Sequence, residues 1–351
     1  MKRLASVLVS WYEKNKRELP WRETGDPYVI WISEIILQQT RVVQGYEYFL
    51  RFTERFPDLK TLAEAPEDEV LKMWQGLGYY SRARNLHAAA KSMNGTFPLT
   101  YEGVRALRGV GDYTAAAICS IAYGLPYAVV DGNVYRVLSR YFGIDTPIDT
   151  TGGKKLFAAL AREQLDEKHP GLYNQAIMDF GAMQCVPVNP RCGECPLSDS
   201  CAAFSEGRVA ELPVKERRTR VTDLYFHYIY VRAGEHTYLN KRTGRGIWQN
   251  LYELPLLETD RETNPEELLR SETFRNLFIS EEDRINSTFR VVCTGVKHQL
   301  SHRTLHVNLY EVKLPAGSVS FSGFLKIKSS EIARYAVPRL VALLLEKMAP
   351  E

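Results

Sequence analysis

Net charge, long apolar runs and cysteine are all scarce in this chain of 351 residues. Its 45 lysine and arginine residues almost balance 42 aspartate and glutamate residues, which leaves a formal net charge of +3. No apolar run reaches the roughly 18 residues that a membrane-spanning helix requires. We therefore expect a soluble, intracellular protein with no membrane partner. Because the bulk charge does not indicate a nucleic-acid binder, any such function has to be argued from local sites.

The length favours two domains, and the hydrophobic pattern changes character along the chain. Through residues 1–203 apolar residues recur at three- and four-residue spacing, which predicts short helices broken by glycine and proline. Residues 204–222 are polar, charged and proline-containing, as is typical of a linker. Over 223–351 alternating segments such as LYFHYIYV and LHVNLYEV predict strands, with helical segments near 264–278 and 330–345. The predicted fold class is multi-domain: an all-α domain followed by a smaller α/β domain.

The six cysteines are unevenly placed, because four of them fall in one short segment. Clustered cysteines in an intracellular protein indicate a metal site rather than disulfides. A structural zinc site usually has two C-x2-C pairs, whereas here only one pair has that spacing. Four thiolates along a short irregular loop favour an iron–sulfur cluster, with zinc as the alternative. The spacing is C-x6-C-x2-C-x5-C, formed by Cys185, Cys192, Cys195 and Cys201.

A second feature is the stretch LRGVGDYTAAAICSIAYGLPYAVVDGNVYRVL at 107–138. Gly109 and Gly111 form a tight turn before an alanine-rich helical segment at 114–122. Glycines let a backbone approach a ligand closely, and the N–H groups at a helix start can bind an anion such as a DNA phosphate. Asp131 opens the next helical run, so it is either a plain N-cap or a functional carboxylate.

Glu34 stands in the apolar context IWISEIILQQT. Such company should raise the pKa of a carboxyl group and keep it protonated, as a general acid requires. The alternative is a buried glutamate satisfied by a partner at a helix contact. A hydrolysis that passes through a cationic state needs an acid to protonate the leaving group and a carboxylate to stabilise the cation, and Glu34 and Asp131 are the candidates for these two tasks.

Several motifs follow one another in order: WxSExxLQQT, GLGYYSRARNL, LxGVGxYTAxAI, DGNVxRVLSR, NQAxMDxGAxxC and the cysteine loop. Together they resemble adenine DNA glycosylases of the MutY type, in the helix-hairpin-helix superfamily of endonuclease III. The resemblance implies a base-excision-repair enzyme that flips adenine out of 8-oxoguanine:A or G:A mispairs in double-stranded DNA. It would hydrolyse the N-glycosidic bond and leave an abasic site. A helix-hairpin-helix at about 105–122, a [4Fe–4S] cluster on the four cysteines, a monomer and a nucleoid-associated place in the bacterial cytoplasm are also implied.

The resemblance assigns roles to the residues of the site. Glu34 would protonate adenine at N7, Asp131 would stabilise or capture the sugar cation, and Asn133 would orient it. Tyr113 stands where lyase-competent relatives carry a Schiff-base lysine, so a monofunctional hydrolase is implied even if the tyrosine only packs. The adenine pocket would be lined by Trp21, Arg22 and Gln175.

Further residues would contact DNA. A flipped base leaves a hole that planar amides or aromatic rings can fill, and the resemblance makes Gln39 and Tyr80 the intercalating members of their pairs. Without it, two adjacent tyrosines would more often belong to a core. The expected DNA-binding set is Gln38, Gln39, Tyr79, Tyr80, Gly109, Gly111 and Arg191.

The segment KRTGRGIW at 241–248, followed by LYELP, resembles the entry of Nudix-like domains. The helical segment NPEELLRSETF lacks the RExxEE metal-binding box, so we expect no pyrophosphohydrolase activity. The domain resembles the one with which MutY-type enzymes recognise 8-oxoguanine through a Phe-Ser-His turn. Here the turn is Leu300-Ser301-His302, in which leucine replaces the aromatic residue. An ordinary polar hairpin turn is the alternative.

Two other functions compete with this interpretation. The first is an endonuclease III-like bifunctional glycosylase and lyase for oxidised pyrimidines, against which Tyr113, Gln175 and the C-terminal domain argue. The second is a non-catalytic DNA-damage binder or redox sensor that uses the cluster. The presence of both Glu34 and Asp131 argues against it.

Overall fold

The computed structural model describes residues 3–216, 221–315, 321 and 323–348. It divides into two compact units, and the division does not follow the chain simply. Unit 1 consists of residues 1–64 and 85–218, whereas unit 2 consists of residues 65–84 and 219–351. No helix in the described ranges is long and apolar enough to cross a bilayer.

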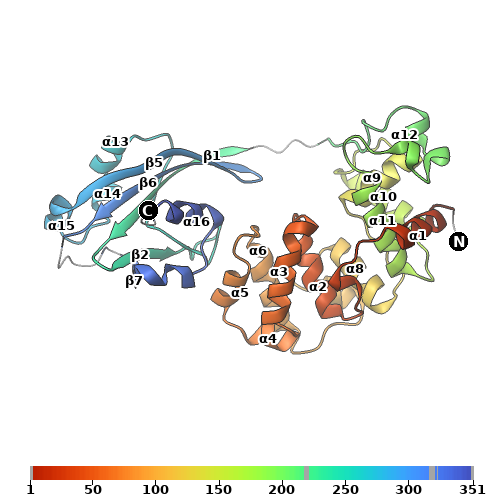
Figure 1. The fold of residues 1–351 in the computed structure, drawn as a ribbon, viewed down its shortest axis with the longest axis horizontal. Helices are drawn as coiled ribbons and strands as arrows, with labels where there is room; N and C mark the ends of the chain where they lie inside the picture. The colour runs from red at the N-terminus through yellow and green to blue at the C-terminus, as the bar shows by residue number, and fades with distance from the viewer. Residues whose placement is uncertain (1–2, 217–220, 316–320, 322, 349–351) are drawn as a thin grey trace. The chain divides into compact units, whose positions relative to one another are not determined.

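Every element of unit 1 within the described residues is helical (Figure 1). Helix α6 (Ser81–Ser92) begins in unit 2 and ends in unit 1. The remaining elements of unit 1 are α1 (Arg3–Asn15), η1 (Pro20–Arg22), α2 (Pro27–Leu37), α3 (Val42–Arg55), α4 (Leu59–Glu64), α7 (Tyr101–Arg105), α8 (Asp112–Tyr123), α9 (Gly132–Phe142), α10 (Thr151–Gln164), α11 (Pro170–Met183), η2 (Cys192–Glu194), η3 (Ser198–Ser200) and α12 (Ala202–Ser205).

Local sequence sets the ends of the helices that carry the site. Asp26 caps α2 by accepting a hydrogen bond from the Tyr28 N–H, and Pro27 supplies the fixed φ of a first helical residue. Gly124 and Gly143 end α8 and α9 in the left-handed conformation, which glycine adopts without steric cost. A core between α1, α8, α9, α10 and α11 holds these helices together, with Leu8, Ala117, Leu138, Phe157 and Phe180 fully or almost fully buried.

Unit 2 contains two sheets (Figure 1). In the larger one the strand order is β4-β1-β6-β5, and β1 and β6 are parallel while the other neighbours are antiparallel. The smaller one has the order β3-β2-β7 and is antiparallel. The elements are α5 (Glu67–Met73), β1 (Thr222–Arg232), β2 (His236–Lys241), β3 (Tyr252–Glu253), β4 (Leu256–Thr259), α13 (Pro265–Arg270), α14 (Glu272–Arg275), α15 (Glu281–Asn286), β5 (Thr288–Gln299), β6 (Arg303–Lys313), β7 (Leu325–Lys328), η4 (Ser329–Arg334) and α16 (Arg339–Glu346).

Helices cover both faces of the larger sheet. Side chains of a strand alternate between the two faces, so one strand can contribute to the core on each side. On β1, Phe226 and Tyr228 point into a core that includes Leu340 of α16. Ile229, on the same strand, points into a second core that includes Phe274 of α14. The β1 strand is therefore buried on both sides, which explains its nearly continuous apolar sequence.

Two expected helical segments are interrupted. The helix expected near 264–278 is divided at Ser271, which is both the C-cap of α13 and the N-cap of α14. The one expected near 330–345 is a 3-10 turn followed by α16, because Pro338 excludes a continuous helix. The expected domain bounds 1–203, 204–222 and 223–351 stay a prediction, and residues 217–220 of the linker lie outside the described residues.

Candidate active site

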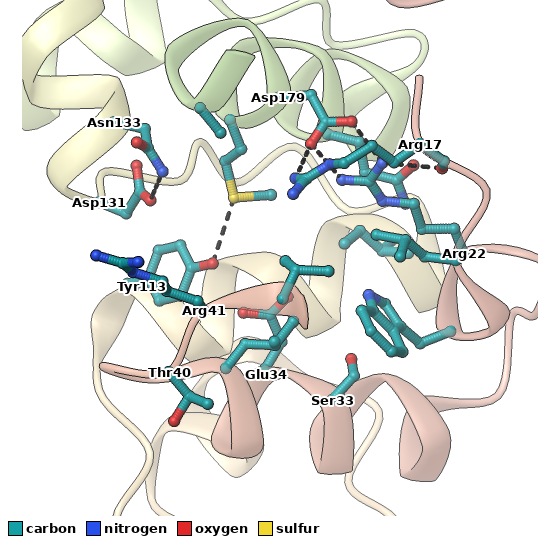
Figure 2. Close-up of a pocket in the computed structure, with 18 of the residues that line it drawn as sticks. Arg17, Arg22, Ser33, Glu34, Thr40, Arg41, Tyr113, Asp131, Asn133 and Asp179 are labelled. Carbon is teal, nitrogen blue, oxygen red and sulfur yellow. Dashed lines mark hydrogen bonds and ion pairs between the residues drawn. The ribbon is translucent and has the colours of Figure 1, made fainter. Parts of the chain in front are cut away.

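A cavity of about 450 Å³ in unit 1 brings together residues from five α-helices and the 3-10 helix η1 (Figure 2). Glu34 reaches it from α2, where its neighbours Ser33 and Ile35 are buried. Burial raises the pKa of Glu34 to about 7, and the charge of Asp131 raises it as well. A hydrogen bond with Tyr113 and the charge of Arg22 act in the opposite direction. A pKa near 7 keeps both the protonated and the ionised form of Glu34 populated at neutral pH.

Asp131 lies across the cavity at the start of α9. Its Oδ1 accepts a hydrogen bond from the Val134 N–H at 2.8 Å, and its Oδ2 accepts one from the Asn133 side-chain amide at 2.9 Å. It is therefore both an N-cap and a wall of the cavity, so the two alternatives for this residue do not exclude each other. Burial raises the pKa of Asp131 against these hydrogen bonds.

The position of Asn133 depends on a close helix contact. A Cβ atom on Gly181 of α11 would lie 2.6 Å from the Asn133 Cβ and 3.1 Å from its carbonyl oxygen. Only glycine lets α11 and the start of α9 approach this closely. Arg136, one turn further along α9, donates to the Asn133 Oδ1 at 2.8 Å and to the Gly181 carbonyl at 2.6 Å.

Tyr113 enters the cavity from the first turn of α8. Its hydroxyl donates to the Met178 sulfur at 3.3 Å (Figure 2) and also hydrogen-bonds to Glu34. Burial, followed by the charge of Glu34, raises the pKa of Tyr113 well above its ordinary value. The group at this position is a neutral phenol and not an amine.

Two arginine side chains, Arg17 and Arg22, form a further part of the cavity wall. Arg22 makes two hydrogen bonds to the carboxylate of Asp179, at 2.5 and 2.7 Å, and Arg17 pairs with the same carboxylate (Figure 2). The Arg22 guanidinium also lies over the Tyr12 ring, 5.6 Å from its centre. The Tyr12 hydroxyl donates to the Gln175 Oε1 at 2.7 Å, which fixes the orientation of that amide.

Trp21 and Arg22 of η1 and Gln175 of α11 all line the cavity, as the sequence predicts for a base pocket. Trp21 is buried and packs edge-on against Phe49 at 4.9 Å. The sequence interpretation missed several residues that the cavity brings in, namely Arg17, Ser33, Arg41, Arg136, Met178 and Asp179. A signal existed for Asp179, since it stands four residues after Gln175 and so shares a helix face with it.

The four clustered cysteines line one small cavity at the end of unit 1. Arg140 of α9 holds the loop by donating to the carbonyls of Val186 and Pro187 at 2.8 and 2.9 Å, and it approaches the Cys185 sulfur at 3.5 Å. Burial raises the pKa of Cys195 to about 11, to which the neighbouring thiols contribute. Among the described residues, no three His, Cys, Asp or Glu side chains converge closely enough to bind a single metal ion.

The residues expected to meet DNA from unit 1 are mostly at its surface. Gly109 adopts a φ of +81°, and a Cβ there would lie 2.8 Å from the Asn85 Cβ. Gly111 opens α8 without a side-chain cap, so the first N–H groups of the helix remain available to an anion. Gln38 donates to the Thr114 hydroxyl at 3.2 Å, and exposed Gln39 has a left-handed φ of +58°. Arg191 is exposed beside the cysteine loop and pairs with Glu194.

Within unit 2, a cavity of about 620 Å³ includes the turn between β5 and β6. Ser301 and His302 are exposed at this turn, whereas Leu300 is half-buried against the core. The Leu300 N–H donates to the Arg303 carbonyl at 2.8 Å, so the segment is also an ordinary hairpin turn. The Tyr79 hydroxyl lies 2.5 Å from the Ser301 hydroxyl.

Comparison with known proteins identifies the chain. Residues 32–162 match the HhH-GPD superfamily of base excision DNA repair proteins, residues 185–201 the iron–sulfur binding domain of endonuclease III, and residues 227–347 the NUDIX domain. An adenine DNA glycosylase of Buchnera aphidicola subsp. Baizongia pistaciae is 33% identical over 86% of this chain and 84% of its own length. The chain belongs to the adenine DNA glycosylase family.

Solved structures share the fold of part of this chain. A thermostable thymine-DNA glycosylase is 30% identical, with a TM-score of 0.54 over 58% of this chain and 95% of that one. An endonuclease III in a non-covalent DNA complex has a TM-score of 0.50 over 58% of this chain and 94% of that one, and at 21% identity it shows the fold alone. The expected fold class, a helical glycosylase domain followed by a Nudix-like domain, is confirmed.

The cofactor expected for an adenine DNA glycosylase, a [4Fe–4S] cluster, is likewise confirmed by the match of residues 185–201. The local chemistry fits such a group, because four thiols line one cavity. Deprotonating them together is unfavourable unless a cationic group neutralises the charge. The residues that would hold it are Cys185, Cys192, Cys195 and Cys201.

One expected DNA contact, that of Tyr80, stays a prediction, and the structure places this side chain in a buried environment. Tyr80 was expected to intercalate into DNA, but its side chain is 4% exposed, and its hydroxyl bonds to the Gly76 N–H and to the Val337 carbonyl. Tyr79 is 50% exposed and has a left-handed φ of +45°. The adjacent tyrosines point to opposite environments, so Tyr79 is the aromatic side chain that can reach a ligand.

Proposed function

We propose that this adenine DNA glycosylase hydrolyses the N-glycosidic bond of adenine mispaired with 8-oxoguanine or guanine in double-stranded DNA. The observation that supports this best is the pair of carboxyl groups in one cavity. Glu34 has a pKa of about 7, whereas Asp131 is held by two hydrogen bonds at the start of α9. Two carboxyl groups in different environments suit an acid and a charge-stabilising role.

The residues divide the chemistry between them. Protonated Glu34 donates its proton to N7 of the flipped adenine, and the bond between the sugar and the base breaks with its electron pair going to the base. The Asp131 carboxylate stabilises the cationic sugar, with Asn133 fixing its direction. Water then bonds to the sugar and releases a proton to solvent. Because Tyr113 offers no amine, no Schiff base forms and the DNA strand stays intact.

Other residues hold the substrate. Trp21, Arg22 and Gln175 line the cavity and bind the edge and face of the flipped adenine. The turn with Gly109 and Gly111 holds a DNA phosphate at the start of α8. Gln38, Gln39 and Arg191 contribute further DNA contacts on unit 1. The protein acts as a monomer at the nucleoid in the bacterial cytoplasm.

Unit 2 supplies the recognition of the opposing base. The cavity beside Ser301 and His302 offers hydroxyl and imidazole groups to the hydrogen-bonding edge of 8-oxoguanine. Tyr79 adds an exposed ring, which compensates for the absence of an aromatic residue at Leu300. Loss of the Tyr79 or Ser301 hydroxyl should weaken discrimination between 8-oxoguanine and guanine by about tenfold at most.

The first test is single-turnover release of adenine from duplexes with 8-oxoguanine, guanine or thymine opposite. We expect alkali-dependent strand cleavage with the first two and none with thymine. Asp131→Asn should lower the rate by at least about a hundredfold, because the sugar cation loses its counter-charge. Asp166→Asn is the matched control, since Asp166 also accepts from a nearby backbone N–H but lies outside the cavity. Strand cleavage without alkali would favour the bifunctional lyase instead.

The pH profile tests Glu34. Because the active form of Glu34 is protonated and its pKa is about 7, adenine release should be close to its maximum near pH 6 and fall about tenfold per pH unit above 8. Glu34→Gln should be inactive across the range. A flat profile through pH 7 in the parent protein would remove Glu34 from the role of acid.

A further inference from the structure

Asp179 of α11 is fully buried, although it is charged. Both of its oxygens are used by Arg22, at 2.5 and 2.7 Å, and Arg17 pairs with it as well. Burial raises the pKa of Asp179, but the hydrogen bonds and charges of the two arginines outweigh this and lower it below its ordinary value. Asp179 is therefore an anion whose two oxygens are directed at cations of the cavity wall.

Arg22 interacts with two carboxyl groups of the cavity, by hydrogen bonds with Asp179 and through its charge with Glu34. Its guanidinium is bound to Asp179 on the α11 side, while Glu34 lines the same cavity from α2 (Figure 2). The charge of Arg22 already lowers the pKa of Glu34 to some extent from where it lies. A two-point ion pair with Asp179 fixes the plane and direction of the guanidinium. Without that partner, the long arginine side chain would be free to turn into the cavity that Glu34 lines.

We propose that Asp179 is a positioning residue that holds Arg22 away from Glu34 and so leaves Glu34 free to carry the proton for the leaving base. This rests on the proposed function, in which Glu34 is the acid. It adds a residue that does not touch the reacting atoms and acts through Arg22. Arg22 pairs with Asp179 rather than with Glu34, so Asp179 stays ionised while Glu34 keeps its proton.

Several charged or titratable groups face Glu34. Arg22 comes from η1, Tyr113 from α8 and Asp131 from the start of α9, and each affects the pKa of Glu34. Arg17, Arg41 and Arg136 also line the cavity. Of all these groups, Asp179 hydrogen-bonds to Arg17 and Arg22, so its substitution frees these two cations and leaves Tyr113 and Asp131 in place.

The test is the pH dependence of single-turnover adenine release from a duplex with 8-oxoguanine opposite, for the whole protein. In Asp179→Asn, the freed Arg22 stabilises the Glu34 carboxylate. The fall of the rate at high pH, which is the alkaline limb of the profile, should therefore move to lower pH. A move of about one pH unit would make the loss of rate at pH 8 about tenfold greater than the loss at pH 5.5. An equal loss at all pH values would overturn the proposal, because disordered structure alone lowers the rate uniformly.

Two further variants identify Arg22 as the mediator. Asp179→Asn combined with Arg22→Gln removes the displaced cation, so the limb should return to the parent position or to higher pH. Arg17→Gln removes the other partner of Asp179 but leaves the Arg22 pair intact, so the limb should not move. If Asp179→Asn does not fold, Arg22→Lys decides, because lysine cannot form the two-point pair with Asp179 and is free to turn into the cavity, so the limb should move to lower pH. An unmoved limb in that variant overturns the proposal.

Failure of the proposed function gives a different result. If the parent protein releases no adenine, or if Glu34→Gln keeps the parent rate and profile, then Glu34 is not the acid and the proposed function itself is wrong. If the parent and Glu34→Gln behave as expected but the limb of Asp179→Asn stays in place, only the positioning role of Asp179 is lost.

Discussion

At the level of single residues, the site depends on pairs that lie far apart in the chain. Tyr12 and Gln175 are 163 positions apart, yet the Tyr12 hydroxyl fixes the Gln175 amide through a 2.7 Å hydrogen bond. An amide can present either its oxygen or its NH2 group to a base, and this bond selects one orientation. Gln175 can therefore offer its NH2 group to an acceptor on adenine.

Tyr12→Phe should release that amide. We expect adenine release to slow about three- to tenfold, which corresponds to the loss of one hydrogen bond of about 1 kcal/mol. Tyr28→Phe is a matched control, because Tyr28 is also buried and donates a 2.7 Å bond, to the Phe56 carbonyl, outside the cavity. Both variants should lose similar stability in urea unfolding, and only Tyr12→Phe should lose activity. Equal activities would show that the amide needs no such support.

Whether the sequence predicts a site residue depends on how far apart that residue and its partners stand in the chain. Glu34, Asp131 and the cysteines stand in local motifs whose residue types already carry the chemistry, so they could be found without a structure. Asp179 could not be assigned a role in this way, because its partner Arg22 is 157 residues away. The exposure of Tyr79 and the burial of Tyr80 were also hidden, since neighbouring residues in an irregular turn have no fixed periodicity.

At the level of elements, α9 connects the two chemical centres of unit 1. Asp131 caps its first turn, Arg136 in the middle donates to the Cys185 carbonyl at 2.7 Å, and Arg140 near its end holds the cysteine loop. The cysteine loop thus fixes the position of the helix that presents Asp131. The contact at Gly181 sets the distance of this helix from α11.

Gly181→Ala should push the start of α9 away from α11. Because the new methyl group would lie 2.6 Å from the Asn133 Cβ, we expect a loss of about 1 to 3 kcal/mol in the free energy of unfolding and slower adenine release. Gly152→Ala in α10 is the matched control, since a Cβ there meets nothing within 4 Å. Alanine is the better helix former by up to about 1 kcal/mol, so this variant should be unchanged or more stable. Urea unfolding of both variants decides between steric and propensity effects.

At the level of the whole molecule, the boundary between the units cuts through the helical part of the sequence. Residues 65–84 belong to unit 2, where Asp68 pairs with Lys241 at 2.7 Å and accepts from the Tyr252 hydroxyl at 3.0 Å. Arg84 donates to the Gln249 carbonyl at 2.7 Å in the same unit. The helical pattern of this segment has the same period whichever unit it packs against. Sequence periodicity therefore predicts the helices but not the unit to which they belong.

Asp68→Asn tests whether these contacts hold α5 in unit 2. Because Asp68 and Lys241 are both partly exposed, the variant should lose less than about 1 kcal/mol of stability. That loss should be local, so amide hydrogen exchange should accelerate up to about fivefold in residues 67–73 and stay unchanged in α8 and α11. Glu64→Gln is the control, because the ion pair between Glu64 and Lys60 is long, at 3.9 Å, and lies on the surface. Unchanged exchange in α5 of Asp68→Asn would mean that its apolar residues Val70 and Leu71, rather than its ion pair, keep it in place.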